Sequence, residues 1–121
     1  MIEPNEAGRL WTAEIAGEYS PEAEAVIAAG DCLATLSRLP DGCAKLIITS
    51  PPYNIGKAYE KAAGLSQYLT ALSPIVDELA RVLSPTGSLC WQVGNYVEDG
   101  ELFPLDIFYY PFFKRHGLKL R

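Results

Sequence analysis

The fold is decided by one stretch near the middle of the chain, KLIITSPPYN at residues 45–54. Its first half, Lys45–Thr49, is rich in β-branched residues and too short for a helix, and it is bounded by Gly42 and Pro51. This is the pattern of a buried parallel strand. Open α/β sheets place their ligand sites where such strands end. The stretch therefore predicts a strand that ends at Ser50. Pro51 and Pro52 should follow on an exposed turn at the carboxyl edge of the sheet, with a binding role.

Upstream of this strand the pattern is less regular. Residues 25–29 fit a helix that begins at Ser20 or, equally, a short buried strand, and periodicity does not decide between the two. Asp31 is of a residue type that caps helices, and the leucines after it form one apolar stripe as far as the turn at residues 40–42. We expect a short helix between Asp31 and that turn.

Downstream, residues 50–64 should form a loop, and the clearest amphipathic helix of the chain follows it. Apolar residues recur at spacings of three and four from Leu65 to Leu83, and Pro74 should kink or divide this helix. A second buried strand is expected at residues 88–93. The two strands should be neighbours, parallel, and joined right-handedly by the long helix.

The last part of the chain predicts two more elements. Residues 103–113 are aromatic-rich and helical by spacing, and residues 118–121 resemble the start of another strand. The apolar side of this helix should carry Leu105, Phe108, Tyr109, Phe112 and Phe113. Strand and helix alternate throughout, so the predicted fold class is α/β with a mainly parallel sheet.

The composition fits one packed domain. The 121 residues are 49% hydrophobic and 21% charged, which excludes a disordered chain. No stretch approaches the ~20 apolar residues of a membrane span, and Glu3 and Glu6 stand where a signal peptide would carry basic residues. We therefore expect a soluble, cytoplasmic protein with no membrane partner. The first 24 residues are acidic and irregular, and they should form an extension in front of a domain at 25–121.

The cysteines and charges narrow the possible ligands. Three cysteines without a C-x-x-C pair, together with the single His116, do not make a metal-binding pattern, so we expect no metal. The thiols should be free and mostly buried, and His116 should be a surface residue at a helix end. The net charge is −5, and basic residues gather only after residue 113. Any surface for nucleic acid is therefore incomplete here or lies near that end.

The turn at Ser50-Pro51-Pro52-Tyr53 carries the clearest chemical signal. Each proline fixes its own φ, lacks an N–H and restricts the residue before it, so the turn is stiff and presents acceptors without backbone donors. The Ser50 side-chain oxygen and the Pro51 carbonyl could accept the hydrogens of an exocyclic amine, and Tyr53 offers a flat face for stacking a base. The same residues also fit an ordinary proline-rich turn with a half-buried tyrosine.

Four blocks of the sequence, in this order and spacing, resemble the S-adenosylmethionine-dependent DNA methyltransferases that modify exocyclic amines. The blocks are Gly30–Leu33, Leu39–Gly42, Leu46–Lys57 and Arg81–Ser88. The resemblance covers roughly residues 25 to 121. It implies a partial doubly wound, Rossmann-like methyltransferase sheet, and it makes residues 25–121 the amino-terminal, target-base-binding part of a catalytic domain.

The resemblance also implies roles for single residues. In the family the proline turn contacts a base flipped out of double-stranded DNA, which makes Ser50, Pro51, Pro52 and Tyr53 the catalytic residues. The form with serine is commoner in cytosine-N4 than in adenine-N6 enzymes, so cytosine is favoured. Asp31 occupies the place of an acidic residue near the adenosine end of the methyl donor, S-adenosylmethionine, although a plain helix N-cap is the alternative.

Residues after the second strand are weaker candidates. Trp91, Gln92 and Asn95 could line the pocket, although Trp91 also suits the core. Lys57 could reach a DNA phosphate or could simply be solvated.

The glycine-rich strand-to-helix turn that binds the methyl donor is missing, since no G-x-G occurs in the 121 residues. The resemblance is therefore to members with a permuted motif order, in which that turn follows the target-recognition region. We expect the amino-terminal part of a site-specific enzyme, completed by a missing carboxyl-terminal half or a complementing chain. The alternative is a truncated, non-catalytic remnant that keeps the fold and an interaction surface. A methyltransferase of protein glutamine or RNA fits less well, because its glycine-rich turn would lie upstream.

Overall fold

The computed structural model describes residues 14–52 and 64–121, and the chain forms two compact units, residues 1–31 and 32–121. In the first unit, β1 (Ile15–Ala16) pairs in parallel with β2 (Ala25–Val26), and the Ile27 N–H donates to the Ala16 carbonyl at 2.9 Å. The strand alternative for residues 25–29 is therefore correct over two residues, but the expected burial is wrong, since Val26 and Ile27 are exposed. The expected boundary after residue 24 stays a prediction.

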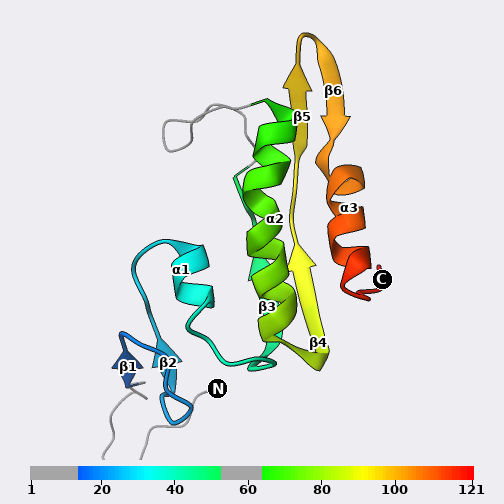
Figure 1. The fold of residues 1–121 in the computed structure, drawn as a ribbon. Coiled ribbons are helices and arrows are strands. Elements are labelled where there is room, and N and C mark those ends of the chain that lie inside the picture. The colour runs from blue at the N-terminus through cyan, green and yellow to red at the C-terminus, as the bar shows by residue number, and fades with distance from the viewer. Residues whose placement is uncertain (1–13, 53–63) are drawn as a thin grey trace, which may run out of the picture. The chain divides into compact units, whose positions relative to one another are not determined.

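The second unit holds the other elements, with strands and helices interleaved (Figure 1). They are α1 (Cys32–Leu36), β3 (Ala44–Thr49), α2 (Leu65–Val82), β4 (Leu83–Trp91), β5 (Asn95–Glu98), β6 (Glu101–Pro104) and α3 (Leu105–Arg115). In Figure 1 the long α2 lies across β3 and β4, and α3 runs beside β4. This arrangement is the α/β class that the sequence predicts.

β3 and β4 form the expected parallel pair, joined through α2. Leu46 stands opposite Ser88, and Thr49 stands opposite Trp91. β4 begins at Leu83 rather than at Ser88, because the chain passes directly from α2 into an irregular stretch of strand. The register shifts between Ala44, which pairs with Leu83, and Leu46. Residues 84–87 therefore form a bulge in β4.

α2 is amphipathic, and its apolar side supplies much of the core. The buried residues recur at spacings of three and four and are Tyr68, Leu72, Val76, Leu79 and Val82. Pro74 lies inside the helix on its exposed side and does not divide it. Pro74 has no N–H to donate to the Thr70 carbonyl four residues earlier. Because Thr70 is also exposed, water can donate to that carbonyl instead.

A hairpin precedes the last helix, and the sequence patterns did not predict it. β5 and β6 pair antiparallel across Asp99-Gly100, whose φ angles are 50° and 80°. The helix therefore begins at Leu105 instead of Phe103, and it ends at Arg115. The residues expected on its apolar side are all buried or half-buried, namely Leu105, Phe108, Tyr109, Phe112 and Phe113.

The strand expected at residues 118–121 does not form. After Gly117 the chain has no regular structure, and Leu120 is 83% exposed. An extended segment is stable only when a neighbouring strand bonds to it, and none of the strands in the described ranges pairs with this one.

One face of the β3–β4 pair is covered, and the other is bare. On the covered face Ile47 is half-buried, and Trp91 packs against the core between α2 and α3. On the opposite face Leu46 is 57% exposed and Ile48 73% exposed, with Cys90 beside Ile48 in the register. We call these three residues the bare face of the sheet.

The expectation of mostly buried thiols is wrong. Cys90 lies on the bare face, Cys32 is exposed in α1, where no residue is buried, and Cys43 is half-buried. All three are free. Within the described ranges, no helix is long and apolar enough to cross a membrane, and no three His, Cys, Asp or Glu side chains gather as metal ligands.

Arg81 ties the end of α2 to α1 and to the turn before β3. Its guanidinium donates to the carbonyls of Leu36 and Leu39 at 2.8 Å each. It also contacts Glu78 at 2.7 Å and Asp41 at 2.5 Å. Hydrogen bonds to Glu78 and Asp41 raise the pKa of Arg81. The Arg81 guanidinium, with several N–H donors in one plane, therefore binds the carboxyl end of α1 to α2, although α1 buries no side chain of its own.

Candidate functional site

The Ser50-Pro51-Pro52 segment, here called the acceptor turn, lies at the carboxyl end of β3, where that strand meets the end of β4. Thr49 pairs with Trp91, and the Gln92 N–H donates to the Thr49 carbonyl at 3.0 Å. β4 therefore holds the residue immediately before the turn. This is the edge of the parallel pair at which the sequence places the turn.

The acceptor turn is only partly exposed. Ser50 and Pro52 are exposed, but Pro51 is buried, so the expectation that both prolines lie on an exposed turn is wrong for Pro51. A proline ring is apolar and has no N–H to satisfy, so its burial leaves no backbone donor unpaired. Pro51 therefore fixes the turn to the body of the unit while its neighbours stay accessible.

Two predicted residues, Tyr53 and Lys57, lie outside the described residues. Their expected roles, stacking on a base and contacting a phosphate, stay predictions.

Tyr68 of α2 holds the acceptor turn from the protein side. Its hydroxyl donates a hydrogen bond to the Pro52 carbonyl. Its ring is 7% exposed and meets the ring of Tyr109 edge-on, with the centroids 6.2 Å apart. The turn is thus connected to α2 and, through it, to α3.

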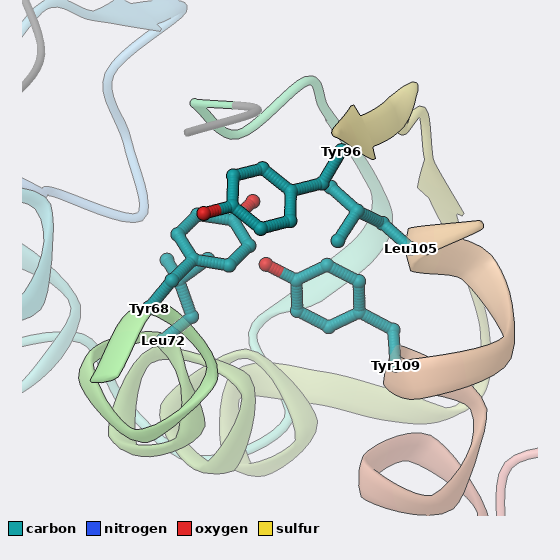
Figure 2. Close-up of a cluster of buried hydrophobic side chains, with 5 residues drawn as sticks. All are labelled: Tyr68, Leu72, Tyr96, Leu105 and Tyr109. Carbon is teal, nitrogen blue, oxygen red and sulfur yellow. The ribbon is translucent and has the colours of Figure 1, made fainter. Parts of the chain in front are cut away.

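Tyr68 belongs to a cluster of three buried tyrosines. Figure 2 shows Tyr68, Tyr96 and Tyr109 converging from α2, β5 and α3, with two leucines packed among them. Burial, and next the Tyr68 hydroxyl, raise the pKa of Tyr109 far above its usual value. Burial and the Glu98 carboxylate, which accepts from Tyr96 at 3.1 Å, raise the pKa of Tyr96. Both phenols therefore stay protonated at neutral pH and keep their donor protons.

The residues expected after the second strand have different environments. Trp91 is half-buried and packs against the core, with its ring centroid 5.0 Å from that of Tyr109 and 5.3 Å from that of Phe113, which supports the core alternative. Gln92 is exposed, and its N–H donates to the carbonyl of Thr49, the residue directly before the acceptor turn. Asn95 is exposed at the start of β5, opposite Pro104. The structure therefore brings Gln92 to the turn and assigns Trp91 to the core.

Asp31 belongs to the first unit, whereas the acceptor turn belongs to the second. It is exposed and directly precedes α1 in the chain. Its two expected roles, donor binding and helix capping, both stay predictions. The turn after β3 does not fit the polar end of a nucleoside donor, because its two prolines supply no N–H groups.

His116 directly follows the last residue of α3 as its C-cap, at a helix end as the sequence predicts. Its Nε2 lies 2.8 Å from Oδ1 of Asp77 on α2, and Arg115 pairs with the same carboxylate. The hydrogen bond from His116, and after it Arg115, lower the pKa of Asp77. Asp77 lies about two and a half turns along α2 from Tyr68, so this cluster belongs to helix packing and not to the acceptor turn.

Tyr68 is the site residue that the sequence patterns missed. In the sequence it is one apolar position among those from Leu65 to Leu83. The available signal was its phenol, because a tyrosine in a stripe of aliphatic residues carries a polar tip that needs a partner once the ring is buried.

Comparison with known proteins places this geometry in a family. A family model described as DNA methylase matches residues 44–116, which contain β3, the acceptor turn, β4 and all of α3. The chain belongs to the DNA methylase family. The resemblance seen in the sequence blocks is thereby confirmed.

Curated methylases share the same part of the sequence. The Type II methyltransferase M.BglII of Bacillus subtilis is 43% identical over 90 residues, which are 74% of this chain and 25% of that protein. M.BamHI of Bacillus amyloliquefaciens is 38% identical over 50% of this chain and 15% of its own length. The DNA adenine methyltransferase YhdJ of Escherichia coli K12 is 35% identical over 59% of this chain and 25% of its own length. This methylase chain therefore spans a quarter or less of the length of these relatives.

Solved methylase structures share its fold. TTHA0409 of Thermus thermophilus, named as a DNA modification methylase, matches with a TM-score of 0.63 at 28% identity, over 76% of this chain and 38% of that one. The same protein in complex with S-adenosyl-L-methionine matches with a TM-score of 0.60 at 26% identity, over 74% of this chain and 38% of that one. The α/β arrangement with its parallel strand pair is thus shared with methylases. The finer expectation of a doubly wound, Rossmann-like sheet stays a prediction.

Proposed function

We propose that this chain is the base-binding part of a DNA methyltransferase that transfers a methyl group from S-adenosylmethionine to the exocyclic amine of a base flipped out of double-stranded DNA. The observation that carries the proposal is the acceptor turn, set at the carboxyl end of a parallel strand and held by β4 and by Tyr68. Membership of the DNA methylase family supports the reaction class.

The acceptor turn suits an amine because it offers oxygens without competing N–H groups. An exocyclic amine is a poor nucleophile, since its lone pair is delocalised into the base. In the proposed complex the Ser50 hydroxyl oxygen and the Pro51 carbonyl accept the amine hydrogens, which favours a pyramidal nitrogen with an available lone pair. Tyr53 is proposed to stack on the flipped base, a contact of about 1–3 kcal/mol in single-strand binders.

S-adenosylmethionine would supply the methyl group in the complete enzyme, and the complex of TTHA0409 with this molecule supports that choice. Asp31 is proposed to accept hydrogen bonds from its adenosine end. One such carboxylate contributes about 1.5–3 kcal/mol, against an association cost of at least about 4 kcal/mol. The 121-residue chain alone should therefore bind the donor weakly or not at all, and should methylate no DNA.

We also propose that the remaining part of the methyltransferase, a carboxyl-terminal half or a complementing chain, covers the bare face. Parallel sheets in α/β proteins are normally covered on both faces, yet Leu46 and Ile48 are exposed here. The outer side of β4 also borders a groove lined by residues 85–91 and by Ile107 and Tyr110 of α3. Free thiols accord with a cytoplasmic location for the assembled enzyme.

Cytosine N4 is the proposed target, with adenine N6 as the alternative. The serine at the first position of the acceptor turn supports cytosine, since the resemblance makes this form commoner in cytosine-N4 enzymes. YhdJ, a relative named as an adenine methyltransferase, supports the alternative.

Mass spectrometry of nucleosides from treated DNA tests the proposal. The chain is incubated with DNA and S-adenosylmethionine, alone and with the remaining part of the methyltransferase as a second polypeptide. We expect N4-methylcytosine only from the mixture. Ser50→Ala should slow its formation roughly 100-fold, by analogy with the loss of one group that stabilises a transition state. Ser37→Ala, at an exposed serine after α1, should leave the rate unchanged.

Two outcomes would contradict the proposal in different ways. N6-methyladenine in place of N4-methylcytosine would overturn the choice of base. A mixture that forms no methylated nucleoside would overturn the function and favour the non-catalytic remnant, which would use the bare face only for binding a partner.

A further inference from the structure

The acceptor turn cannot be held by backbone donors of its own prolines, because Pro51 and Pro52 have no N–H. Its first end is fixed by the sheet, where the Thr49 carbonyl accepts from the Gln92 N–H at 3.0 Å. At Pro52, the Tyr68 hydroxyl donates to the carbonyl. The direction of the turn is therefore set from outside it, by the Gln92 N–H before Ser50 and by the Tyr68 hydroxyl at Pro52.

Tyr68 is itself fixed by its neighbours. Its ring meets the ring of Tyr109 at an interplanar angle of 76°, and Tyr109 is 1% exposed. The ring centroids of Tyr109 and Trp91 lie 5.0 Å apart, and Trp91 pairs with Thr49 in the sheet. The acceptor turn is thus connected to α2, α2 to α3, α3 to β4, and β4 back to β3, the strand that precedes the turn. Among these contacts, the hydrogen bond from the Tyr68 hydroxyl is the one made to the turn itself.

The Tyr109 phenol supports the same arrangement. In Figure 2 its hydroxyl points from α3 toward Tyr68. Burial, and after it the Tyr68 hydroxyl, raises the pKa of Tyr109, so its phenol keeps its proton. The geometry gives the buried Tyr109 oxygen no hydrogen-bond partner among the described residues, and the Tyr68 hydroxyl donates to the Pro52 carbonyl.

We propose that Tyr68 is a positioning residue of the methyltransferase, whose hydroxyl fixes the Pro52 carbonyl and thereby the direction in which Ser50 and Pro51 face the target amine. This inference rests on the function proposed above. Tyr68 acts through the acceptor turn and does not touch the base. Loss of its hydroxyl should slow methyl transfer roughly 10-fold to 100-fold with little change in KM for DNA, because misplacement by ~1 Å affects the reacting geometry more than binding.

The contact is tested first on the 121-residue chain, without any measurement of activity. Proline is labelled with carbon-13 at its carbonyl, and the Pro52 resonance is identified by its loss in Pro52→Ala. Tyr68→Phe removes the donor and keeps the ring, so the Pro52 resonance should move upfield. Tyr19→Phe, at a tyrosine of the first unit that is 44% exposed, should leave it in place. An unmoved Pro52 resonance in folded Tyr68→Phe would overturn the proposal.

A second variant keeps the test decisive if Tyr68→Phe does not fold. Replacing Tyr68 by its ring-fluorinated analogue keeps the shape and makes the hydroxyl a stronger donor. The Pro52 resonance should then move downfield, and an unmoved resonance would again overturn the proposal.

The completed enzyme separates positioning from packing. Tyr68→Phe should show a slower single turnover at an unchanged KM for DNA, whereas Tyr19→Phe should match the wild type. A normal rate in Tyr68→Phe would overturn the positioning role and leave the proposed function intact. If the wild-type mixture transfers no methyl group, the proposed function fails and the positioning role fails with it, even where the carbonyl contact is present.

Discussion

At the scale of single residues, Gly87 is the position where one added carbon atom would disturb the β3–β4 pair. A Cβ there would lie 2.7 Å from Cδ1 of Leu83, 3.0 Å from Oγ of Ser84 and 3.1 Å from the carbonyl oxygen of Ala44. Leu83 is buried, and the Ala44 oxygen belongs to the backbone of β3, so neither moves freely. The bulge in β4 therefore requires glycine at this point.

We expect Gly87→Ala to destabilise the chain by about 1–3 kcal/mol, the usual range for overpacking a core. Gly17→Ala, where no atom lies within 4 Å of the added carbon, should change stability by less than about 0.5 kcal/mol. Denaturant unfolding of the whole chain, followed by tryptophan fluorescence, measures both variants. Equal midpoints would show that the bulge relaxes around the new methyl group, against this expectation.

The acceptor turn illustrates what could be predicted for the candidate site. Its place at a strand end follows from local features, namely a β-branched run and two prolines. The burial of Pro51 and the hydrogen bond from Tyr68 depend on how α2 packs against the turn, and spacing along the sequence does not encode that contact. Asp31 fits two roles by residue type, and a residue type alone does not choose between them.

At the scale of elements, α3 is joined to α2 by apolar packing and by a cluster of charged side chains around Asp77. Asp77 of α2 accepts from Arg115, and its Oδ1 lies 2.8 Å from Nε2 of His116. These partners lower the pKa of Asp77 from its ordinary 3.8. Because the folded-state pKa lies below the unfolded one, the stability from ionised Asp77 is present above pH 3.8 and is lost as the pH falls through the folded value.

Asp77→Asn should therefore lower stability by roughly 0.5 kcal/mol near pH 5, a small value because the Arg115 and Asp77 side chains are 43% and 47% exposed. The difference from the wild type should shrink as the pH falls below 3.8, where the wild-type carboxylate gains its proton in the folded state. Thermal unfolding across this range measures it. Glu101→Gln, at an exposed carboxylate with no ion pair to a described residue, serves as the control. A difference that persisted unchanged to pH 2 would mean that charge on Asp77 does not join the helices.

The elements also differ in how far the sequence predicted them. α2 and the β3–β4 pair follow from apolar spacing, which is strong in both. The β5–β6 hairpin was missed although Asp99-Gly100 is a turn signal with positive φ at both residues, because Phe103 was assigned to the aromatic helix behind it. Residues 118–121 have the pattern of a strand but no partner, and pairing is a property of the folded chain.

At the scale of the whole molecule, the second unit is an α/β layer pair with one apolar sheet face uncovered. We expect the isolated chain to bind an apolar fluorescent dye at the bare face. Ile48→Lys should reduce that fluorescence with little loss of stability, because the Ile48 side chain is already 73% exposed. Val97→Lys, at a side chain of β5 that is 59% exposed, should change the dye signal much less. Equal losses in the two variants would show that the dye does not distinguish the bare face from other apolar surface.

The parallel pairing of β3 with β4 also sets an order of events while the chain is synthesised. The partner of Thr49 is Trp91, which leaves the ribosome only after the whole of α2 has been made. Until then β3 is an apolar strand without a neighbour, and pairings across such a crossover form slowly because the intervening chain must first close. The acceptor turn reaches its final shape only when α2 delivers Tyr68 and β4 delivers Trp91. Its geometry is thus a late product of folding, and a substitution that delays strand pairing would delay the maturation of the turn from any distance.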